Sequence, residues 1–147
     1  MTWYCAYASN MNRRQMETRL DRMSLRWMIG CVSDYALRFN KEGQDRSGKA
    51  NLVPCQGEKV WGILYEISEE EFARLAPFEP GYRSTTLEVT IQSSDQTCVA
   101  QAFLADATKP ERLPSSAYLQ LILRGADEHG LPPDHCHTLR QVKTSAR

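Results

Sequence analysis

The N-terminal segment constrains the fold most, because a short apolar strand pattern runs there directly into a helix pattern. Residues 3–7 (Trp-Tyr-Cys-Ala-Tyr) are typical of a buried strand, and residues 11–20 of a helix. Ala8, Ser9 and Asn10 interrupt the pattern, and Ser9 or Asn10 is the expected helix cap. The first N–H groups of a helix lack intrahelical partners and favour a negative charge nearby. We therefore predict a site for a small anionic molecule at this turn.

The composition is that of a soluble globular protein without strong charge. The chain has 147 residues, with 18 Lys and Arg against 18 Asp and Glu, and a net charge of zero. This balance gives no electrostatic basis for binding nucleic acid or an anionic membrane. No apolar run approaches the roughly 20 residues of a membrane span, and the first ten residues lack the features of a signal peptide. We expect one domain over residues 1–147, with no nucleic-acid or membrane partner.

The five cysteines are far apart in the chain, at Cys5, Cys31, Cys55, Cys98 and Cys136. An odd number without paired spacing argues against a disulfide framework. Reduced and mostly buried thiols are typical of a cytoplasmic protein, so we expect a cytoplasmic location.

Strand and helix patterns follow one another in an order that predicts an α+β fold. The clearest central strand is 60–67, where apolar residues alternate between two faces. Ser68 caps the next helix, and Glu71 completes a capping box. The other expected elements are strands within 26–40 and at 51–54, a hairpin of 85–92 and 98–105, and helices at 115–129 and 131–142, with loops or turns at 41–49, 56–58, 78–82 and 106–114. This order favours a mixed or antiparallel sheet curled into a small barrel with flanking helices.

Most sequence signatures of catalysis are absent. The chain has no phosphate-binding Gly-Lys-Ser loop, no dinucleotide glycine fingerprint, no Gly-x-Ser-x-Gly elbow and no Cys-x-x-Cys pair. Residues 134–137 (Asp-His-Cys-His) have metal-ligand side chains, but four adjacent residues cannot surround one ion tetrahedrally. We therefore expect no metal site.

Glu79 is a candidate for proton transfer, because its neighbours are apolar and aromatic. It lies between Phe78 and the turn residues 80–82 (Pro-Gly-Tyr), just after a helix that follows a buried strand. A carboxylate in such surroundings loses hydration, which raises its pKa and suits acid–base catalysis near neutral pH. The alternative is an ordinary surface glutamate in a turn. Tyr118 likewise fits either the core or a pocket.

Several segments, in their order along the chain, resemble the γ-glutamylcyclotransferase family. Residues 4–11 (Tyr-Cys-Ala-Tyr-Ala-Ser-Asn-Met) resemble the family's opening Tyr-Phe-Ala-Tyr-Gly-Ser-Asn-Leu/Met, and residues 60–67 resemble its Val-Trp-Gly-Val strand. Residues 75–79 end on a glutamate at the position of the family's catalytic glutamate. Residues 113–118 and 125–132 resemble its Pro-Ser-Pro-x-Tyr and Gly-Ala-x-Glu-x-Gly-Leu-Pro segments.

The resemblance implies a small barrel-like α+β fold and an enzyme that needs no metal or organic cofactor. The implied substrate is a small γ-glutamyl amide, which is cyclised to 5-oxoproline with release of the free amine. Glu79 is the implied general acid and base. The implied pocket for the γ-glutamyl part consists of the opening segment and one later tyrosine: Tyr4, Cys5, Ala6, Tyr7, Ala8, Ser9, Asn10 and Tyr118. A homodimer is left open.

Two residues depart from the family pattern. Ala8 stands where the family usually has glycine, and a positive φ there would strain alanine by roughly 1 kcal/mol. Pro80 follows Glu79 where glycine is common, and proline favours an extended conformation of the residue before it. Two alternatives therefore stay open: a γ-glutamylamine cyclotransferase that acts on a biosynthetic amine, and a small-molecule binding or interaction protein without catalysis.

Overall fold

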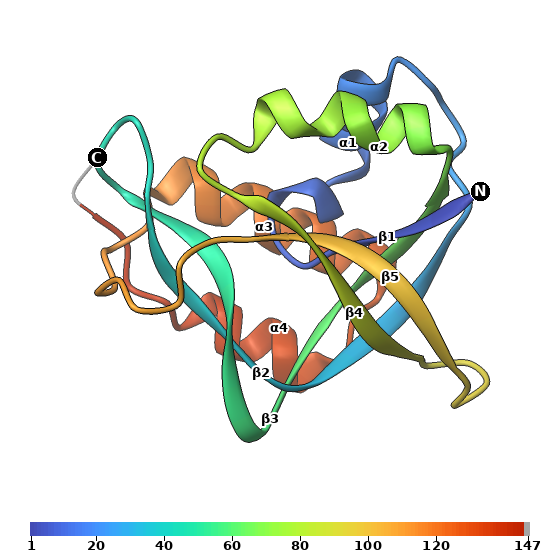
Figure 1. Ribbon diagram of the computed structural model, residues 1–147. Helices are drawn as coiled ribbons and strands as arrows, with labels where there is room; N and C mark the ends of the chain where they lie inside the picture. The colour runs from blue at the N-terminus through green and yellow to red at the C-terminus, as the bar shows by residue number, and fades with distance from the viewer. Residues whose placement is uncertain (146–147) are drawn as a thin grey trace.

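The fold is a closed barrel of five strands with helices packed on its outside (Figure 1). The computed structural model describes residues 1–145; residues 146 and 147 of the predicted domain lie outside the described residues. The strands are β1 (Thr2–Ala6), β2 (Trp27–Glu42), β3 (Gly48–Ile67), β4 (Arg83–Ile91) and β5 (Thr97–Leu104). The helices are α1 (Arg13–Leu20), α2 (Glu69–Leu75), α3 (Ser116–His129) and α4 (Pro133–Arg140), with 3₁₀ turns η1 (Ser9–Met11) and η2 (Ala76–Phe78). The predicted α+β fold with a small mixed barrel is confirmed.

The barrel holds β1 between two neighbouring strands. Its order is β1-β3-β2-β4-β5, and β5 returns to β1. The pairs are antiparallel except β1 and β5, which pair in parallel where Tyr4 lies opposite Gln101. Closure removes the free edges of the sheet. It therefore fixes the end of β1, where the predicted binding turn begins.

β2 and β3 form a ribbon much longer than the strands predicted from the sequence. The two strands take both ends of the predicted loop 41–49, so that the loop is confined to residues 43–47. β3 runs straight through the predicted turn 56–58, so that prediction is wrong. Asp34 bulges out of β2 with a φ of 64°, and its carboxylate accepts a hydrogen bond from the Gly57 N–H at 3.0 Å. Such a bulge lets polar, half-exposed residues stay paired in a twisted ribbon.

The turn after β1 differs from the prediction in its helix cap. The predicted caps, Ser9 and Asn10, belong to the separate turn η1, and the side chain of Asn12 caps α1 instead. The Arg13 N–H at the start of α1 donates to Glu128 Oε1 at 2.6 Å, so α3 satisfies this donor. An anion at this corner would thus meet the N–H groups of the turn rather than those of the helix.

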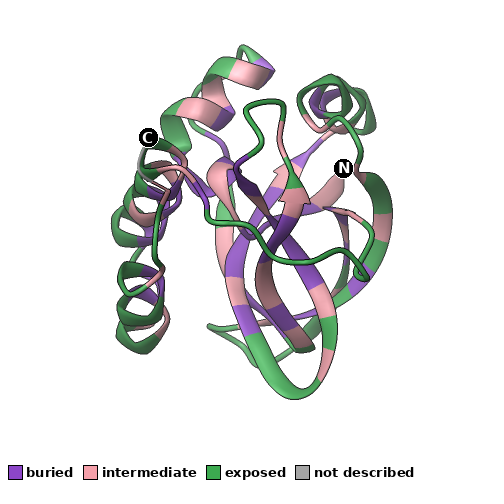
Figure 2. Ribbon diagram, turned by 90° about the vertical axis from the view of Figure 1, so that its left-hand side faces the viewer, coloured by how far each residue is buried: buried purple, intermediate pink, exposed green. Residues whose placement is uncertain are grey.

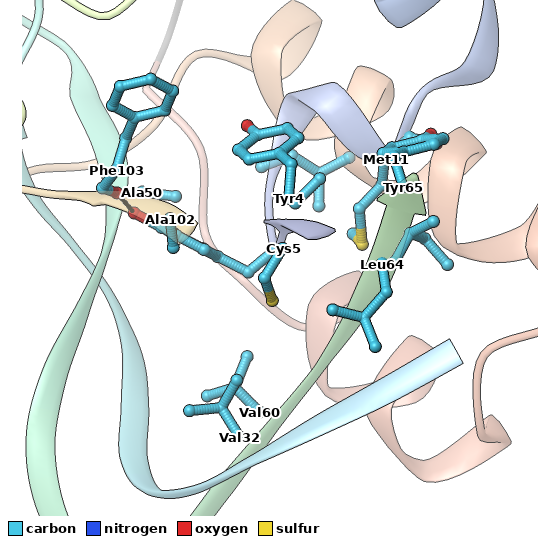
Figure 3. Packing of buried hydrophobic residues seen from close by; sticks show 14 of the residues in the cluster. Tyr4, Cys5, Met11, Val32, Ala50, Val60, Leu64, Tyr65, Ala102 and Phe103 are labelled. Atoms are coloured by element: carbon cyan, nitrogen blue, oxygen red, sulfur yellow. Dashed lines mark hydrogen bonds between the residues drawn. The ribbon is translucent and has the colours of Figure 1, made fainter. Parts of the chain in front are cut away.

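Buried residues lie on the barrel strands and on parts of the helices beside the barrel (Figure 2), and they form one hydrophobic core. Tyr4 and Cys5 are neighbours on β1 and point to opposite sides of the strand (Figure 3), as strand alternation requires. Gly125 of α3 lies against η1, since a Cβ added there would be 2.5 Å from the backbone nitrogen of Asn12. The absence of a side chain at this position lets α3 press on the turn that follows β1.

Other local signals are confirmed. Ser68 and Glu71 form the predicted capping box of α2, Ser115 caps α3, and Gly130 ends α3 with a φ of 71°. The cysteines are free thiols. Within residues 1–145, no helix combines the length and hydrophobicity needed to cross a membrane.

Candidate functional site

A small cavity of about 30 Å³ lies where the end of β1, the α2–β4 connection and α3 meet. It is lined by Tyr4, Tyr7, Ala8, Ser9, Asn10, Ala50, Glu79, Tyr82, Phe103 and Tyr118. Three parts of the chain that are distant in sequence thus share one space: the opening turn, Glu79 and Tyr118. We call this space the inner cavity.

A tight turn directs Glu79 into the inner cavity. The Glu79 carbonyl accepts a hydrogen bond from the Tyr82 N–H at 3.2 Å, and Gly81 between them has a φ of 84°. Proline followed by a glycine of positive φ is the signature of a type II turn, so the turn predicted at 78–82 is confirmed. Glu79 itself has φ −125° and ψ 57°, so the fully extended conformation expected before Pro80 is not adopted.

The electrostatic state of Glu79 follows from its burial. Its side chain is only 18% exposed, and this desolvation raises its pKa from 4.5 to about 7, against the opposing effect of the Arg19 charge. The Glu79 carboxyl group is therefore largely shielded from solvent. A carboxyl group with a pKa near neutrality can accept and return a proton with little free-energy cost.

Asn10 connects Glu79 to both β1 and α1. Its Nδ2 donates to the Tyr4 hydroxyl at 2.9 Å and to Glu79 Oε1 at 3.3 Å. Its Oδ1 accepts from Gln15 Nε2 at 3.1 Å and from Arg19 Nη1 at 2.9 Å. Asn10 is 3% exposed, and these four contacts use its full hydrogen-bonding capacity.

Tyrosines build the remaining polar wall around Ala50 of β3. The Tyr82 hydroxyl donates to the Ala50 carbonyl at 2.6 Å, and the Ala50 N–H donates to the Tyr118 hydroxyl oxygen at 3.0 Å. Burial raises the pKa of both phenols, so they stay neutral. Because Tyr118 uses its oxygen as an acceptor, its own O–H remains available to donate to a bound molecule.

Two residues of the predicted opening segment do not line the inner cavity. Cys5 points away from Tyr4, and burial raises the pKa of its thiol to about 12. The Ala6 carbonyl lies against β3, where a Cβ on Gly62 would approach it to 2.7 Å. The Cys5 side chain therefore points away from the inner cavity, and Ala6 is not among the residues that line it. Ala8 does line the cavity, and its φ is −135°. Because this φ is negative, alanine does not carry the strain that a positive φ would cause at this position.

The turn supplies free backbone donors on the cavity side. Within residues 1–145, the N–H groups of Ser9 and Asn10 donate to no protein acceptor, whereas those of Met11 and Asn12 bond to Ala8 and Ser9 carbonyls. Unpaired N–H groups near a cavity can hold a carboxylate or a developing oxyanion.

An outer chamber of about 700 Å³ adjoins the inner cavity and shares Ser9, Glu79, Tyr82 and Tyr118 with it. Two lysines from the β2–β3 ribbon stand over the shared tyrosines. Lys49 Nζ lies 4.4 Å from the centroid of the Tyr118 ring, and Lys41 Nζ lies 5.8 Å from that of Tyr82. The outer chamber therefore combines aromatic walls with charges of both signs, because Glu42 and Asp45 line it together with Arg19, Lys41 and Lys49.

Sequence reasoning missed several residues of the site. Gln15 and Arg19 carry a usable signal, because polar residues four apart on a helix share one face, here toward the turn. Ala50 and Phe103 carry none, since small and apolar residues within strands mark a core in general. Within residues 1–145, no cluster of His, Cys, Asp or Glu could hold a metal ion.

Comparison with known proteins bears on this arrangement. A sequence model of the AIG2-like family matches residues 59–139, more than half of the chain. The chain belongs to the AIG2-like family. The match includes Glu79 and Tyr118 but begins after the opening turn.

Relatives and solved structures agree with this assignment. A gamma-glutamylcyclotransferase from Bos taurus is 25% identical and one from Homo sapiens 24% identical, each over 95% of this chain and 78% of the relative. A solved gamma-glutamyl cyclotransferase superposes with a TM-score of 0.89 at 22% identity, covering 99% of this chain and 90% of that chain. The resemblance drawn from the sequence segments is confirmed, and the structural likeness shows that the fold is shared.

Proposed function

We propose that this protein is a γ-glutamylcyclotransferase, which cyclises a γ-glutamyl amide to 5-oxoproline and releases the free amine. The observation that carries the proposal is Glu79, a buried carboxyl group with a pKa near neutrality that shares a tyrosine-lined cavity with the opening turn. The names of the curated relatives support the same reaction.

The substrate of this reaction contains its own nucleophile. Its α-amino nitrogen attacks the γ-carbonyl carbon, a C–N bond forms and closes a five-membered ring, and the original amide C–N bond breaks. Neither water nor an enzyme nucleophile is consumed. The protein has to fold the substrate back on itself, and such intramolecular closure can supply several kcal/mol of the barrier.

Glu79 acts as the general base and then the general acid in this ring closure. The attacking nitrogen loses a proton and the leaving nitrogen gains one, so one carboxylate can accept the first proton and deliver it to the second site. The free N–H groups of Ser9 and Asn10 bind the substrate α-carboxylate or the oxyanion on the γ-carbon. The Tyr118 O–H donates a further hydrogen bond to the bound molecule.

The two spaces divide the substrate between them. The inner cavity, at about 30 Å³, has room for one reacting group beside Glu79. The outer chamber, at about 700 Å³, has the size of an ordinary small-molecule site and takes the rest of the substrate, including the leaving group. Lys41 and Lys49 favour a leaving amine that bears a carboxylate, and hence a γ-glutamyl amino acid over a γ-glutamyl derivative of a simple amine.

Product analysis tests the proposal. The protein is incubated with γ-glutamylalanine and with γ-glutamylethylamine, which differ only in the carboxylate of the leaving group, and 5-oxoproline and glutamate are quantified. We expect 5-oxoproline and free amine in equal amounts, with the alanine compound preferred. Release of glutamate would identify a hydrolase instead. Saturable binding without turnover would support the alternative of a non-catalytic binding protein.

A further inference from the structure

Gln15 and Arg19 of α1 control the orientation of a side chain in the inner cavity without lining that cavity themselves. Gln15 Nε2 and Arg19 Nη1 both donate to Asn10 Oδ1, at 3.1 and 2.9 Å. Gln15 Nε2 also lies 2.9 Å from Ser9 Oγ. Two donors that are four residues apart on one helix thus converge on a single amide oxygen.

This convergence decides which way the Asn10 amide faces. The oxygen and nitrogen of an amide have nearly the same shape, so the neighbouring donors and acceptors set its orientation. The N–H groups of Gln15 and Arg19 can bond only to the oxygen. The Asn10 Nδ2 must therefore face the inner cavity, where it donates to Tyr4 and to Glu79 Oε1.

Arg19 also acts on Glu79 directly. Its Nη1 lies 3.9 Å from Glu79 Oε1, and its guanidinium carbon lies 4.7 Å from the centroid of the Phe78 ring, beside Glu79 in the chain. Packing on this ring holds the guanidinium plane at the border of the inner cavity and the outer chamber. Only 22% of the Arg19 side chain is exposed, so solvent weakens its charge less than that of a free surface arginine.

The other ionisable groups around Glu79 carry no competing charge in the inner cavity. They are tyrosines from every element packed against it, and burial raises the pKa of each phenol: Tyr4 and Tyr7 from β1 and its end, Tyr82 before β4, and Tyr118 from α3. Lys41 and Lys49 face the outer chamber, where Asp45 lies 3.9 Å from Lys49. Within residues 1–145, Arg19 is the ion-pair partner of Glu79.

We propose that Arg19 is a positioning residue for Glu79, which keeps Oε1 as a fixed acceptor and leaves Oε2 to carry the proton. The inference rests on the proposed function. A proton on Oε1 would point at the Asn10 N–H and at the Arg19 guanidinium, both of which are donors. Within residues 1–145, Oε2 accepts no hydrogen bond from the protein. The proton therefore moves from the substrate nitrogen to Oε2, and from Oε2 to the leaving nitrogen.

The first test measures Glu79 without any substrate. The side-chain carboxyl carbons of the glutamates are labelled with ¹³C, and their shifts are followed against pH in the wild type and in Arg19→Met, with Glu79→Gln to assign the signal. We expect the Glu79 midpoint to rise by about one pH unit in Arg19→Met, because a nearby cation favours the carboxylate. Arg19→Lys keeps the charge and should restore most of the shift.

Arg14→Met is the matched control, since Arg14 is an exposed arginine of the same helix. Its removal should leave the Glu79 midpoint unchanged. An Arg19→Met midpoint that coincides with that of Arg14→Met would overturn the proposal.

The second test follows 5-oxoproline release against pH in the same variants. The acid limb of kcat/KM should move upward with the Glu79 midpoint in Arg19→Met, and return in Arg19→Lys. Gln15→Met should leave the limb in place but lower kcat roughly fivefold, because Arg19 alone then holds the Asn10 amide. A limb that does not follow the Glu79 midpoint would refute a role of Arg19 in proton transfer. If neither the wild type nor any variant forms 5-oxoproline, the proposed function fails. The titration still decides whether Arg19 lowers the pKa of Glu79.

Discussion

The two spaces of the site are built in opposite ways. The inner cavity is held by buried Asn10, whose side chain uses all of its hydrogen-bonding groups, and by two half-buried tyrosines that are hydrogen-bonded to Ala50. The outer chamber is bordered by the tip of the β2–β3 ribbon, where exposed Asp45 and half-buried Lys49 approach each other only to 3.9 Å. Exposed pairs of this kind contribute little to stability.

This difference matches what each half of the substrate requires. The γ-glutamyl part is common to all γ-glutamyl amides, and ring closure depends on holding it in one geometry. The leaving group varies from one compound to the next, so charge and room matter more there than rigidity. We infer that the inner cavity determines the reaction and the outer chamber determines the choice of substrate.

Gly125→Ala should cause the largest loss of stability, because it disturbs the contact between α3 and the turn that lines the inner cavity. The new Cβ would lie 2.5 Å from the backbone of the turn at Asn12, so α3 or the turn has to move. We expect a loss of about 3 kcal/mol in the free energy of unfolding, measured by urea denaturation. Gly130→Ala is the control, since its Cβ meets nothing within 4 Å and only the φ of 71° opposes it, at about 1 kcal/mol. Equal losses in the two variants would contradict a tight contact between α3 and the turn.

The pH dependence of stability should reveal the buried carboxyl group of the inner cavity. The pKa of Glu79 is about 7 in the folded protein, where burial raises it, and 4.5 when the side chain is fully solvated, as in the unfolded chain. Between these values the folded protein holds a proton that the unfolded chain has lost, so the free energy of unfolding falls as pH rises from 4.5 to 7. Well above pH 7 the penalty is constant, at about 3 kcal/mol.

Glu79→Gln should remove this penalty. Compared with the wild type, we expect the variant to be more stable by about 3 kcal/mol at pH 8, with a much smaller difference at pH 4.5. Glu70→Gln on the exposed side of α2 should leave the profile unchanged. A Glu79→Gln profile parallel to that of the wild type from pH 4.5 to 8 would mean that Glu79 titrates normally.

The outer chamber should respond to substitution by smaller and more selective effects. Lys41→Met and Lys49→Met should each lower kcat/KM for γ-glutamylalanine roughly fivefold, because a weakly held surface charge contributes about 1 kcal/mol. Neither should change kcat/KM for γ-glutamylethylamine. Lys59→Met is the control, since Lys59 lies over the Trp61 ring at 5.5 Å, outside both spaces. A uniform loss on both substrates would contradict a carboxylate subsite.

The same division explains how much the sequence could predict. Signals within a few residues were reliable: the opening strand, the capping box at Ser68, and the Pro80-Gly81 turn all form as predicted. The sequence predicted strands within the β2–β3 ribbon but not its full length. Its pairing spans distant residues, and its polar, glycine-containing parts are typical of loops. Bulges such as that at Asp34 also shift the alternation of side chains between the two faces of the ribbon.

The candidate site was only partly predictable for the same reason. Glu79 was a candidate from its apolar and aromatic neighbours, the family resemblance added the roles of Glu79 and Tyr118, and the structure places both residues in one cavity. Cys5 and Ala6 were included as parts of the opening segment, but strand alternation turns Cys5 away from Tyr4, and Ala6 does not line the cavity. The spacing of Gln15 and Arg19 places them on one face of α1, but no local pattern shows that this face packs against the turn.

Turnover of γ-glutamylalanine by Glu79→Gln, compared with Glu70→Gln, tests the central claim most directly. If Glu79 is the proton carrier of the inner cavity, the variant should stay folded, and its 5-oxoproline release should fall by roughly a thousandfold, with Glu70→Gln unaffected. Release of 5-oxoproline by Glu79→Gln at the wild-type rate would contradict the account.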